Sequence, residues 1–390
     1  MNKLGSNKFL LFTPIVVVAV IFIFSLTLFP SVNPTPKDLP IAILNEDTGV
    51  TLPAQGQLNM GNKISDSVVD SKATSQMVEW IKVSNMKELQ EGLSNQEFYA
   101  AMRIPSDFSA TQVSLKSPEP ELSKIEVYMN QGMNKMGANI ATNLFNRISE
   151  NINYTIREEN FTFYKSQGGN LTVEQAKSLV QPVSFNVTNV NEVGENSANG
   201  NAPLSLFQPF WMSSIAGAAM LYFAFKNRTN ITRKEKLVAS IKQLIAGSIV
   251  AIIAGFGFTW IAETIIGFTI PSFLDTAWFL TITYISFFLL ISAVISWTGI
   301  KGIGLFALLL FFGAPLLSMP PEFMSSFYHD WVYSWLPMRF MVDGLRNLLF
   351  FDKEFILVGP TLTLLSISLV SIILLLLSSL IGNTTKKKSS

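Results

Sequence analysis

Few residues in this chain are of the types that perform catalysis or bind metals. The 390 residues contain no cysteine and one histidine, His329, so thiolate ligands, cysteine nucleophiles and sites with several histidines are excluded. The dipeptide Gly-Lys does not occur, which excludes a phosphate-binding loop of the G-x-x-x-x-G-K-[ST] type. The sequence therefore predicts neither an enzyme nor a cofactor or metal site.

The first pattern of charges that could act together is "LPMRFMVDGLRNLLFF" at 336–351. Arg339, Asp343 and Arg346 follow one another there at intervals of four and three residues, which places them on one face of a helix and favours ion pairing. With Pro337, they form a candidate outer gate segment. A purely structural ion pair would explain the same pattern.

The second pattern is "KNRTNITRKEKLVASIKQ" at 226–243. It gathers charges of both signs in one run: Arg233, Lys234, Glu235 and Lys236. Thr232 and Glu235 have the spacing of a capping box, which predicts the start of a helix. This segment is a candidate docking surface for a partner protein. The alternative is that its charges only fix the orientation of the chain in a membrane.

These patterns lie in an unusually apolar chain, with 49% hydrophobic and 14% charged residues, as is typical of a membrane protein. Apolar runs of about 20 residues, long enough to cross about 30 Å of hydrocarbon, occur at six places: 9–29, 206–225, 239–262, 276–297, 302–319 and 355–382. We expect six transmembrane helices. The first run is longer than the core of a signal peptide and lacks a clear cleavage site, so we expect it to be a retained anchor.

The placement of lysine and arginine predicts the orientation of the spans. With the N-terminus inside, the cytoplasmic pieces hold 12 basic residues and one acidic residue, Glu235. This distribution obeys the positive-inside rule. We expect a multi-pass protein of the cell membrane, with both termini cytoplasmic and residues 31–205 extracellular. Because each basic cluster adjoins an apolar span, we do not expect binding to nucleic acid.

Residues 31–205 lack an apolar run long enough to span a membrane, and they alternate short strands with helices. Strands are expected at 40–44, 78–84, 98–105 and 124–130, and helices at 58–72, 85–93, 106–115 and 172–181. This alternation predicts an α/β layer with parallel neighbouring strands. A polar stretch at 191–203 is expected to be the linker back to the membrane.

A long helix is expected from Met133 onward, because apolar residues recur there every three or four positions. They form one stripe: Met133, Met136, Ile140, Leu144, Ile148, Ile152 and Ile156. The stripe either packs on the sheet of its own domain or forms a stalk or self-association surface. The sequence leaves both interpretations open.

A candidate helix-packing face lies in the third predicted span. Gly247, Ala251 and Gly255 are four residues apart, so small side chains share one face and permit close contact between helices. The contact is either within the chain or between two copies.

Three segments resemble the phage infection protein (YhgE/Pip) family: "LPIAILNEDTGV" at 39–50, "YAAMRIPSDFSATQVSL" at 99–115 and "KIEVYMNQGMNKMGANI" at 124–140. That family is similar in turn to the membrane subunits of ABC-2-type exporters. These permeases have six spans, an aqueous domain between the first two, and a Leu-Pro and Leu-Arg segment like 336–351. The resemblance covers nearly the whole chain. The chain departs from the family pattern in two ways. Only eight residues precede the first span, and the long helical insert of several family members does not occur.

The resemblance implies a polytopic α-helical membrane protein of six transmembrane helices, with an α/β extracellular domain inserted between helices one and two. Its expected parts are a short N-terminus with the first helix (1–30), the extracellular domain (31–205), a five-helix membrane domain (206–382) and a basic cytoplasmic tail (383–390).

The function that the resemblance implies is that of the permease subunit of an ABC-2-type exporter. Such a subunit moves an amphiphile, lipid-linked molecule, peptide or drug outward. It would be powered by a separate ATPase on the cytoplasmic side of the lipid bilayer, and would pair with a second permease as a homodimer or heterodimer. The resemblance makes the segment 226–243, with Arg233, Lys234, Glu235 and Lys236, the candidate loop for docking and coupling this ATPase. Two alternatives stay open: a cell-surface receptor, as the family's phage-infection name suggests, and a scaffold of a secretion system.

Overall fold

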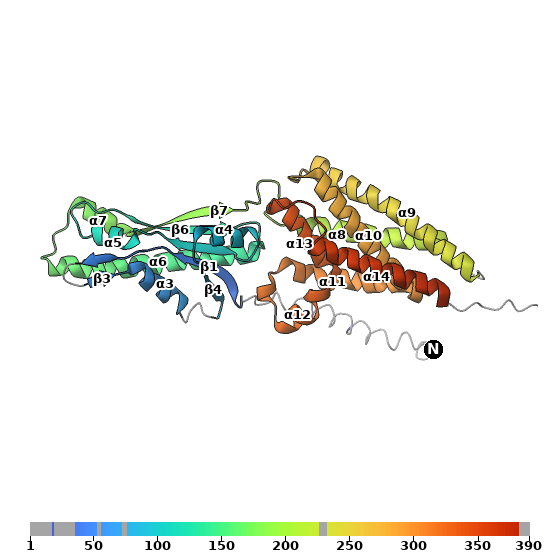
Figure 1. The fold of residues 1–390 in the computed structure, drawn as a ribbon, viewed down its shortest axis with the longest axis horizontal. Coiled ribbons are helices and arrows are strands. Elements are labelled where there is room, and N and C mark those ends of the chain that lie inside the picture. The colour runs from blue at the N-terminus through green and yellow to red at the C-terminus, as the bar shows by residue number, and fades with distance from the viewer. Residues whose placement is uncertain (1–17, 19–35, 53–55, 72–75, 226–231, 382–390) are drawn as a thin grey trace, which may run out of the picture. The chain divides into compact units, whose positions relative to one another are not determined.

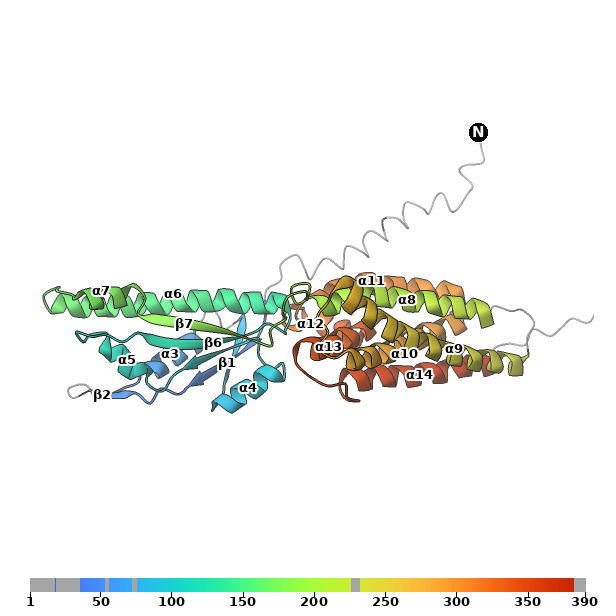
Figure 2. The same ribbon diagram turned by 90° about the horizontal axis from the view of Figure 1, so that it is seen from above.

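The structure, a computed structural model, describes residues 18, 36–52, 56–71, 76–225 and 232–381. The chain divides into two compact units, one of which is Thr35–Val193 and the other of which contains Gly194–Ser390. Most elements of both units are labelled in Figures 1 and 2. The first predicted span, 9–29, lies outside the described residues apart from Val18, as does the tail at 383–390.

The first unit is built on a five-stranded sheet of order β4-β1-β5-β6-β7. Its strands are β1 Leu39–Asn45, β4 Val78–Lys82, β5 Ala100–Ile104, β6 Ser123–Asn130 and β7 Val183–Val190, and a separate hairpin joins β2 Val50–Leu52 to β3 Gly56–Leu58. β1 pairs in parallel with β4 and β5, and β6 with β7. The prediction of an N-terminal α/β layer is confirmed.

The expectation of parallel neighbours is wrong for β5 and β6, which are antiparallel. The helix α5, Phe108–Ser114, follows β5, and the start of β6 is held beside this helix. Gln112 donates a hydrogen bond from its amide to the hydroxyl of Ser123, at 2.7 Å. The chain therefore re-enters the sheet from the end at which β5 left it, which makes the two strands antiparallel.

Strand β7 was not among the predicted strands, although its sequence VSFNVTNV alternates apolar and polar residues. It lies at the edge of the sheet, and its start is fixed by a buried asparagine of the long helix α6, Lys135–Ser166. The amide of Asn153 donates to the carbonyl oxygen of Val183 at 3.0 Å, and the Val183 N–H donates to the Asn153 side chain at 2.9 Å. Asn153 thus replaces one missing strand neighbour.

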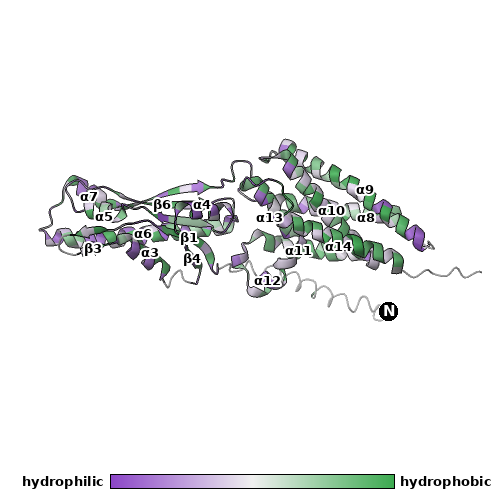
Figure 3. Cartoon of the chain, viewed as in Figure 1, coloured by the Kyte–Doolittle hydropathy of each residue, from purple (hydrophilic) through white to green (hydrophobic). Residues whose placement is uncertain are grey.

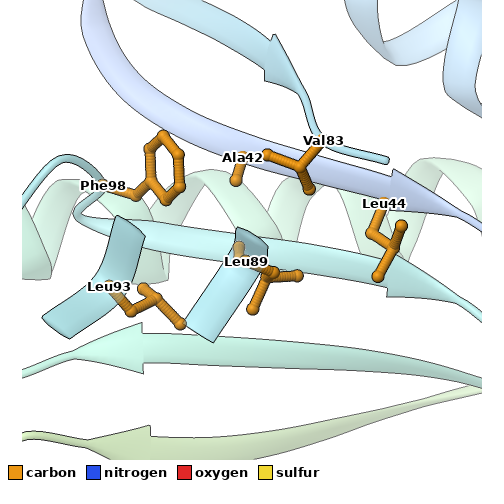
Figure 4. Packing of buried hydrophobic residues seen from close by; sticks show 7 residues of the cluster. Ala42, Leu44, Val83, Leu89, Leu93 and Phe98 are labelled. Atoms are coloured by element: carbon orange, nitrogen blue, oxygen red, sulfur yellow. The ribbon is translucent and has the colours of Figure 1, made fainter. Parts of the chain in front are cut away.

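Helices cover both faces of β1. On one face, Ala42 and Leu44 pack against Leu89 and Leu93 of α4, Met86–Ser94, as Figure 4 shows. The opposite face of the sheet is covered by α3, which contacts β1, and by α6, which contacts β6 and β7. Phe145 of α6 meets the ring of Trp80 of β4 edge-on. The shorter helices of this unit are α3 Met60–Val69 and α7 Val173–Val180.

The apolar stripe of α6 packs inside its own unit, as the first of the two interpretations states. Leu144, Ile148, Ile152 and Ile156 are all buried. A stalk or self-association surface built from these four side chains is therefore excluded, because they already have partners in the same unit.

The second unit is helical. Its helices are α8 Ala202–Phe225, α9 Arg233–Trp260, α10 Phe273–Thr298, α11 Ile303–Ser318, α12 Ser326–Trp331, α13 Pro337–Phe350 and α14 Pro360–Ile381. Within the described residues, five helices are long and apolar enough to cross a membrane: α8, α9 with the π-helical turn Ile261–Ile266, α10, α11 and α14. Figure 3 shows their apolar composition. They correspond to the second to sixth predicted spans.

Helix α8 begins inside the predicted linker 191–203, at Ala202. Pro203 lies in the first turn, where its lack of an N–H removes no hydrogen bond from the helix. Helix α10 is the centre of this unit: most of its side chains are buried, and it contacts α8, α9, α11, α13 and α14.

Candidate functional site

The helices of the second unit have two distinct ends. At one end, Phe279 near the start of α10, Gly344 of α13 and Thr361 at the start of α14 line a common cavity of about 240 Å³. At the other end, Ser240 near the start of α9 and Ser379 near the end of α14 are hydrogen-bonded at 2.6 Å. We call these the α13 end and the α9-start end.

The candidate outer gate segment forms the helix α13. Pro337 is its first residue, a position that needs no N–H, and the apolar side chains of the helix share one buried face: Met338, Met341, Val342 and Leu345. Gly344 permits α13 to lie against α10, because a Cβ at this position would overlap the ring of Phe279.

The three charged side chains of α13 lie together, half-buried. Asp343 is 3.8 Å from Arg339 and 3.8 Å from Arg346. Both distances are longer than a direct hydrogen bond, and neither arginine Nε has a hydrogen-bond partner among the described residues. The cluster thus holds two arginines and one carboxylate in loose ion pairs, with both Nε donors buried.

Arg339 also ties α13 to the preceding turn, Tyr333–Trp335. Its guanidinium lies over the ring of Tyr333, 4.7 Å from the ring centre, and donates to the Tyr333 carbonyl oxygen at 3.5 Å. Position and orientation of the arginine are thus set by a residue outside the helix. The sequence spacing predicted the charge cluster, but it gave no sign of this aromatic contact.

The candidate ATPase-docking segment is the beginning of α9, and its predicted capping box is present. The Thr232 hydroxyl accepts from the Glu235 N–H at 3.3 Å, and the Glu235 carboxylate accepts from the Thr232 N–H at 2.7 Å. Glu235 therefore stabilises the start of α9 as part of this capping box. Residues 226–231 of the segment lie outside the described residues.

The basic side chains that follow the cap are open to a partner. Arg233 and Lys234 are exposed, and Lys236 is half-buried. Beside them, a cavity of about 400 Å³ lies between the end of α8 and the start of α9, lined among others by Phe225, Lys234 and Val238. The α9-start end thus offers cationic groups next to an apolar recess.

The small-residue face of α9 packs on α10 of the same chain. A Cβ on Gly247 would overlap the ring of Phe288, and one on Gly255 would overlap the hydroxyl of Thr281. Ala251 between them is fully buried. The alternative, a contact between two copies through this face, is wrong because α10 already covers it.

Sequence reasoning missed a buried carboxylate in the α/β unit. Asp47, two residues after the end of β1, accepts hydrogen bonds from the N–H of Gly61 at 2.8 Å and from the N–H and hydroxyl of Ser109. These donors are in the first turns of α3 and α5, so one carboxylate joins two helix N-termini to the sheet. The segments 39–50 and 99–115, quoted above for their resemblance, therefore meet in space.

That role is structural, since every acceptor oxygen of Asp47 is used in these bonds and in one from the Gly49 N–H. Among the described residues, no cluster of three or more His, Cys, Asp or Glu side chains is arranged to hold a metal ion.

Five apolar helices, four of them packed around the central α10, define a multi-pass membrane protein. The family model described as ABC-2 family transporter protein matches residues 8–380. Since this match covers almost the whole chain, the protein belongs to the ABC-2 family of transporter membrane proteins.

Two further proteins are similar to parts of the chain. The uncharacterized protein YhgE of Bacillus subtilis (strain 168) is 24% identical over 125 residues, which are 32% of this chain and 16% of that relative. The match thus spans a small part of YhgE. A crystal structure of a domain assigned to an ABC type-2 transporter of Thermotoga maritima MSB8 aligns with 38% of this chain and 84% of its own, at 18% identity and a TM-score of 0.26.

Proposed function

We propose that this protein is the permease subunit of an ABC exporter that moves an amphiphilic molecule outward across the cell membrane. The observation that carries the proposal is the family match over residues 8–380, which includes both units. In this proposal both termini are cytoplasmic, 31–205 is extracellular, and 9–29 is a sixth span. A second permease, identical or related, completes the pathway.

The energy would come from a separate ATPase, because the chain has no phosphate-binding loop of its own. We assign its docking surface to the α9-start end, because the excess of basic residues there predicts a cytoplasmic position. Exposed Arg233 and Lys234 would pair with acidic residues of the ATPase. The recess beside Phe225 and Val238 would receive an apolar side chain or a helix of the partner.

From the charge cluster of α13 we infer that the transported molecule carries an anionic group. Arg339 and Arg346 share one carboxylate, Asp343, at 3.8 Å each, so positive groups outnumber negative groups in the cluster. In the proposed orientation this cluster lies near the outer face of the membrane, where an anionic headgroup would pause before release. The transported class that fits best is therefore an anionic amphiphile.

The docking surface can be tested by the double charge reversal Arg233→Glu and Lys234→Glu in the wild-type background. Glu235 is left unchanged because it caps α9. We expect normal expression and insertion, but loss of ATPase binding and of coupled ATP turnover. Lys301→Glu is the matched control, since this lysine is exposed at the turn between α10 and α11. A double variant that binds the ATPase like the wild type would refute the assigned surface.

A receptor is the second candidate, because Thr35–Val193 forms a compact unit of its own. Binding of an extracellular ligand to cells would be measured with and without this unit. If no ATPase associates with the wild-type protein, this candidate moves ahead of the exporter.

A further inference from the structure

Three large aromatic side chains are exposed on the segment between α11 and α13. Phe327, Trp331 and Trp335 are four residues apart and are 62%, 74% and 54% exposed. Trp335 donates a hydrogen bond from its indole N–H to the Trp331 carbonyl oxygen at 2.6 Å, which keeps the last two together. We call these three side chains the aromatic patch. Such a patch is costly in water and marks an interaction surface.

The segment that carries the patch is firmly held by its other side. Phe323, Met324, Tyr333 and Leu336 are all buried in the helical unit. The turn Tyr333–Trp335 contacts both α12 and α11. The aromatic patch is therefore a fixed feature of the surface, presented by anchored residues.

The patch lies at the α13 end, where other tryptophans are also exposed. Trp260 ends α9 and Trp278 stands in the second turn of α10, and they are 52% and 45% exposed. Four of the seven tryptophans of the chain thus belong to this one end of the spans. Tryptophan gathers at the interface between membrane and water, because its ring is apolar while its N–H seeks a polar partner.

We propose that the aromatic patch is inserted into the bilayer at the level of the lipid headgroups, so that α12 lies along the membrane surface. With six residues, α12 is too short to cross the hydrocarbon. Its exposed aromatic side chains lie next to the ends of the spans. The surface that the spans meet there is the headgroup layer of the membrane, so lipid is the partner that we infer for the patch. This proposal needs a membrane but does not depend on transport or on an ATPase.

The insertion has a consequence for the charge cluster. Tyr333 follows Trp331 by two residues, and its ring and carbonyl oxygen hold Arg339. Anchoring the patch in the headgroup layer therefore sets the depth of Arg339 in the membrane. The lipid surface and the charged helix are connected through this one tyrosine.

The absence of native cysteine makes the test direct, because single cysteines can be labelled with a nitroxide. Trp331→Cys and Phe327→Cys are made separately in the full-length protein, so that each retains two of the three aromatic side chains. His329→Cys is the control on α12, and Ser94→Cys at the exposed end of α4 is the control in the other unit. The labelled proteins are reconstituted in phosphatidylcholine vesicles.

Collision rates with oxygen, which concentrates in lipid, and with a neutral nickel chelate, which stays in water, are then measured by electron paramagnetic resonance. We expect the oxygen-to-nickel ratio to be several-fold higher at 327 and 331 than at 94, with 329 between them. A ratio at both 327 and 331 equal to that at 94 would overturn the proposal. So would low collision rates with both reagents together with dipolar broadening between labels, since this would show a second copy covering the patch.

Discussion

The carboxylate of Asp47 shows how much one side chain can contribute to the α/β unit. Asp47→Ala would leave the Gly61 N–H and both donors of Ser109 without partners in a buried place. Loss of such bonds costs about 2–4 kcal/mol. We expect faster hydrogen exchange in peptides from 39–70 and 100–115 of the full-length protein. Asp107→Ala is the control, because Asp107 makes no side-chain cap bond to α5; equal exchange in both variants would contradict the assigned role.

Arg103 and Glu126 make the same unit sensitive to acid. Burial alone would raise the pKa of Glu126, but hydrogen bonds from Arg103 and Tyr128 outweigh it and lower the pKa below its usual 4.5. A carboxyl whose pKa is lower in the folded state stabilises the fold at neutral pH. That contribution is lost as the pH falls below 4.5 and through the folded-state value.

Glu126→Gln should therefore speed hydrogen exchange in β5 and β6 at pH 7, and the difference from the wild type should shrink as the pH is lowered through the acid range. Exchange in the two proteins is compared at matched pH, so that the intrinsic rate cancels. A difference that grows on acidification would show that the sign of the pKa change is wrong.

At the scale of elements, close packing of α9 on α10 depends on Gly247. Gly247→Ala must displace the ring of Phe288, and overpacking of this kind costs about 1–3 kcal/mol. The gain in helix propensity, about 1 kcal/mol, offsets this only in part. Gly257→Ala on the same helix is the control, because nothing lies within 4 Å of its added Cβ. In detergent, we expect a lower melting temperature for the first variant and an equal or higher one for the second.

Local patterns predicted most of the elements. The capping box of Thr232 and Glu235 marks the observed start of α9, because a cap depends only on neighbours within four residues. The spacing of Arg339, Asp343 and Arg346 predicted their proximity for the same reason. Only the helical repeat is needed to bring them together.

Contacts between distant segments could not be predicted in this way. Asp47 meets Ser109 across 62 residues, and the small-residue face of α9 is covered by Phe288 of another helix. The antiparallel pairing of β5 with β6 likewise depends on where α5 holds the next strand. In each case the decisive partner is chosen by the tertiary fold.

At the scale of the whole molecule, the proposed topology can be tested with single cysteines. Ser94→Cys lies on an exposed surface of the α/β unit and should react with an impermeant thiol reagent on intact cells, whereas Thr229→Cys should react only after the cells are opened. If only Thr229→Cys were labelled on intact cells, the orientation of the chain in the membrane would be the opposite of the one proposed.

The central claim is that this ABC-2 family member works with a separate ATPase. The most direct measurement is to isolate the tagged wild-type protein from its native membranes in mild detergent, identify the proteins that accompany it, and assay ATP turnover. We predict a stoichiometric partner that carries a phosphate-binding loop, with turnover that is lost when Arg233 and Lys234 are replaced by glutamate. Repeated isolation of the intact protein with no such partner and no ATP turnover would contradict the claim.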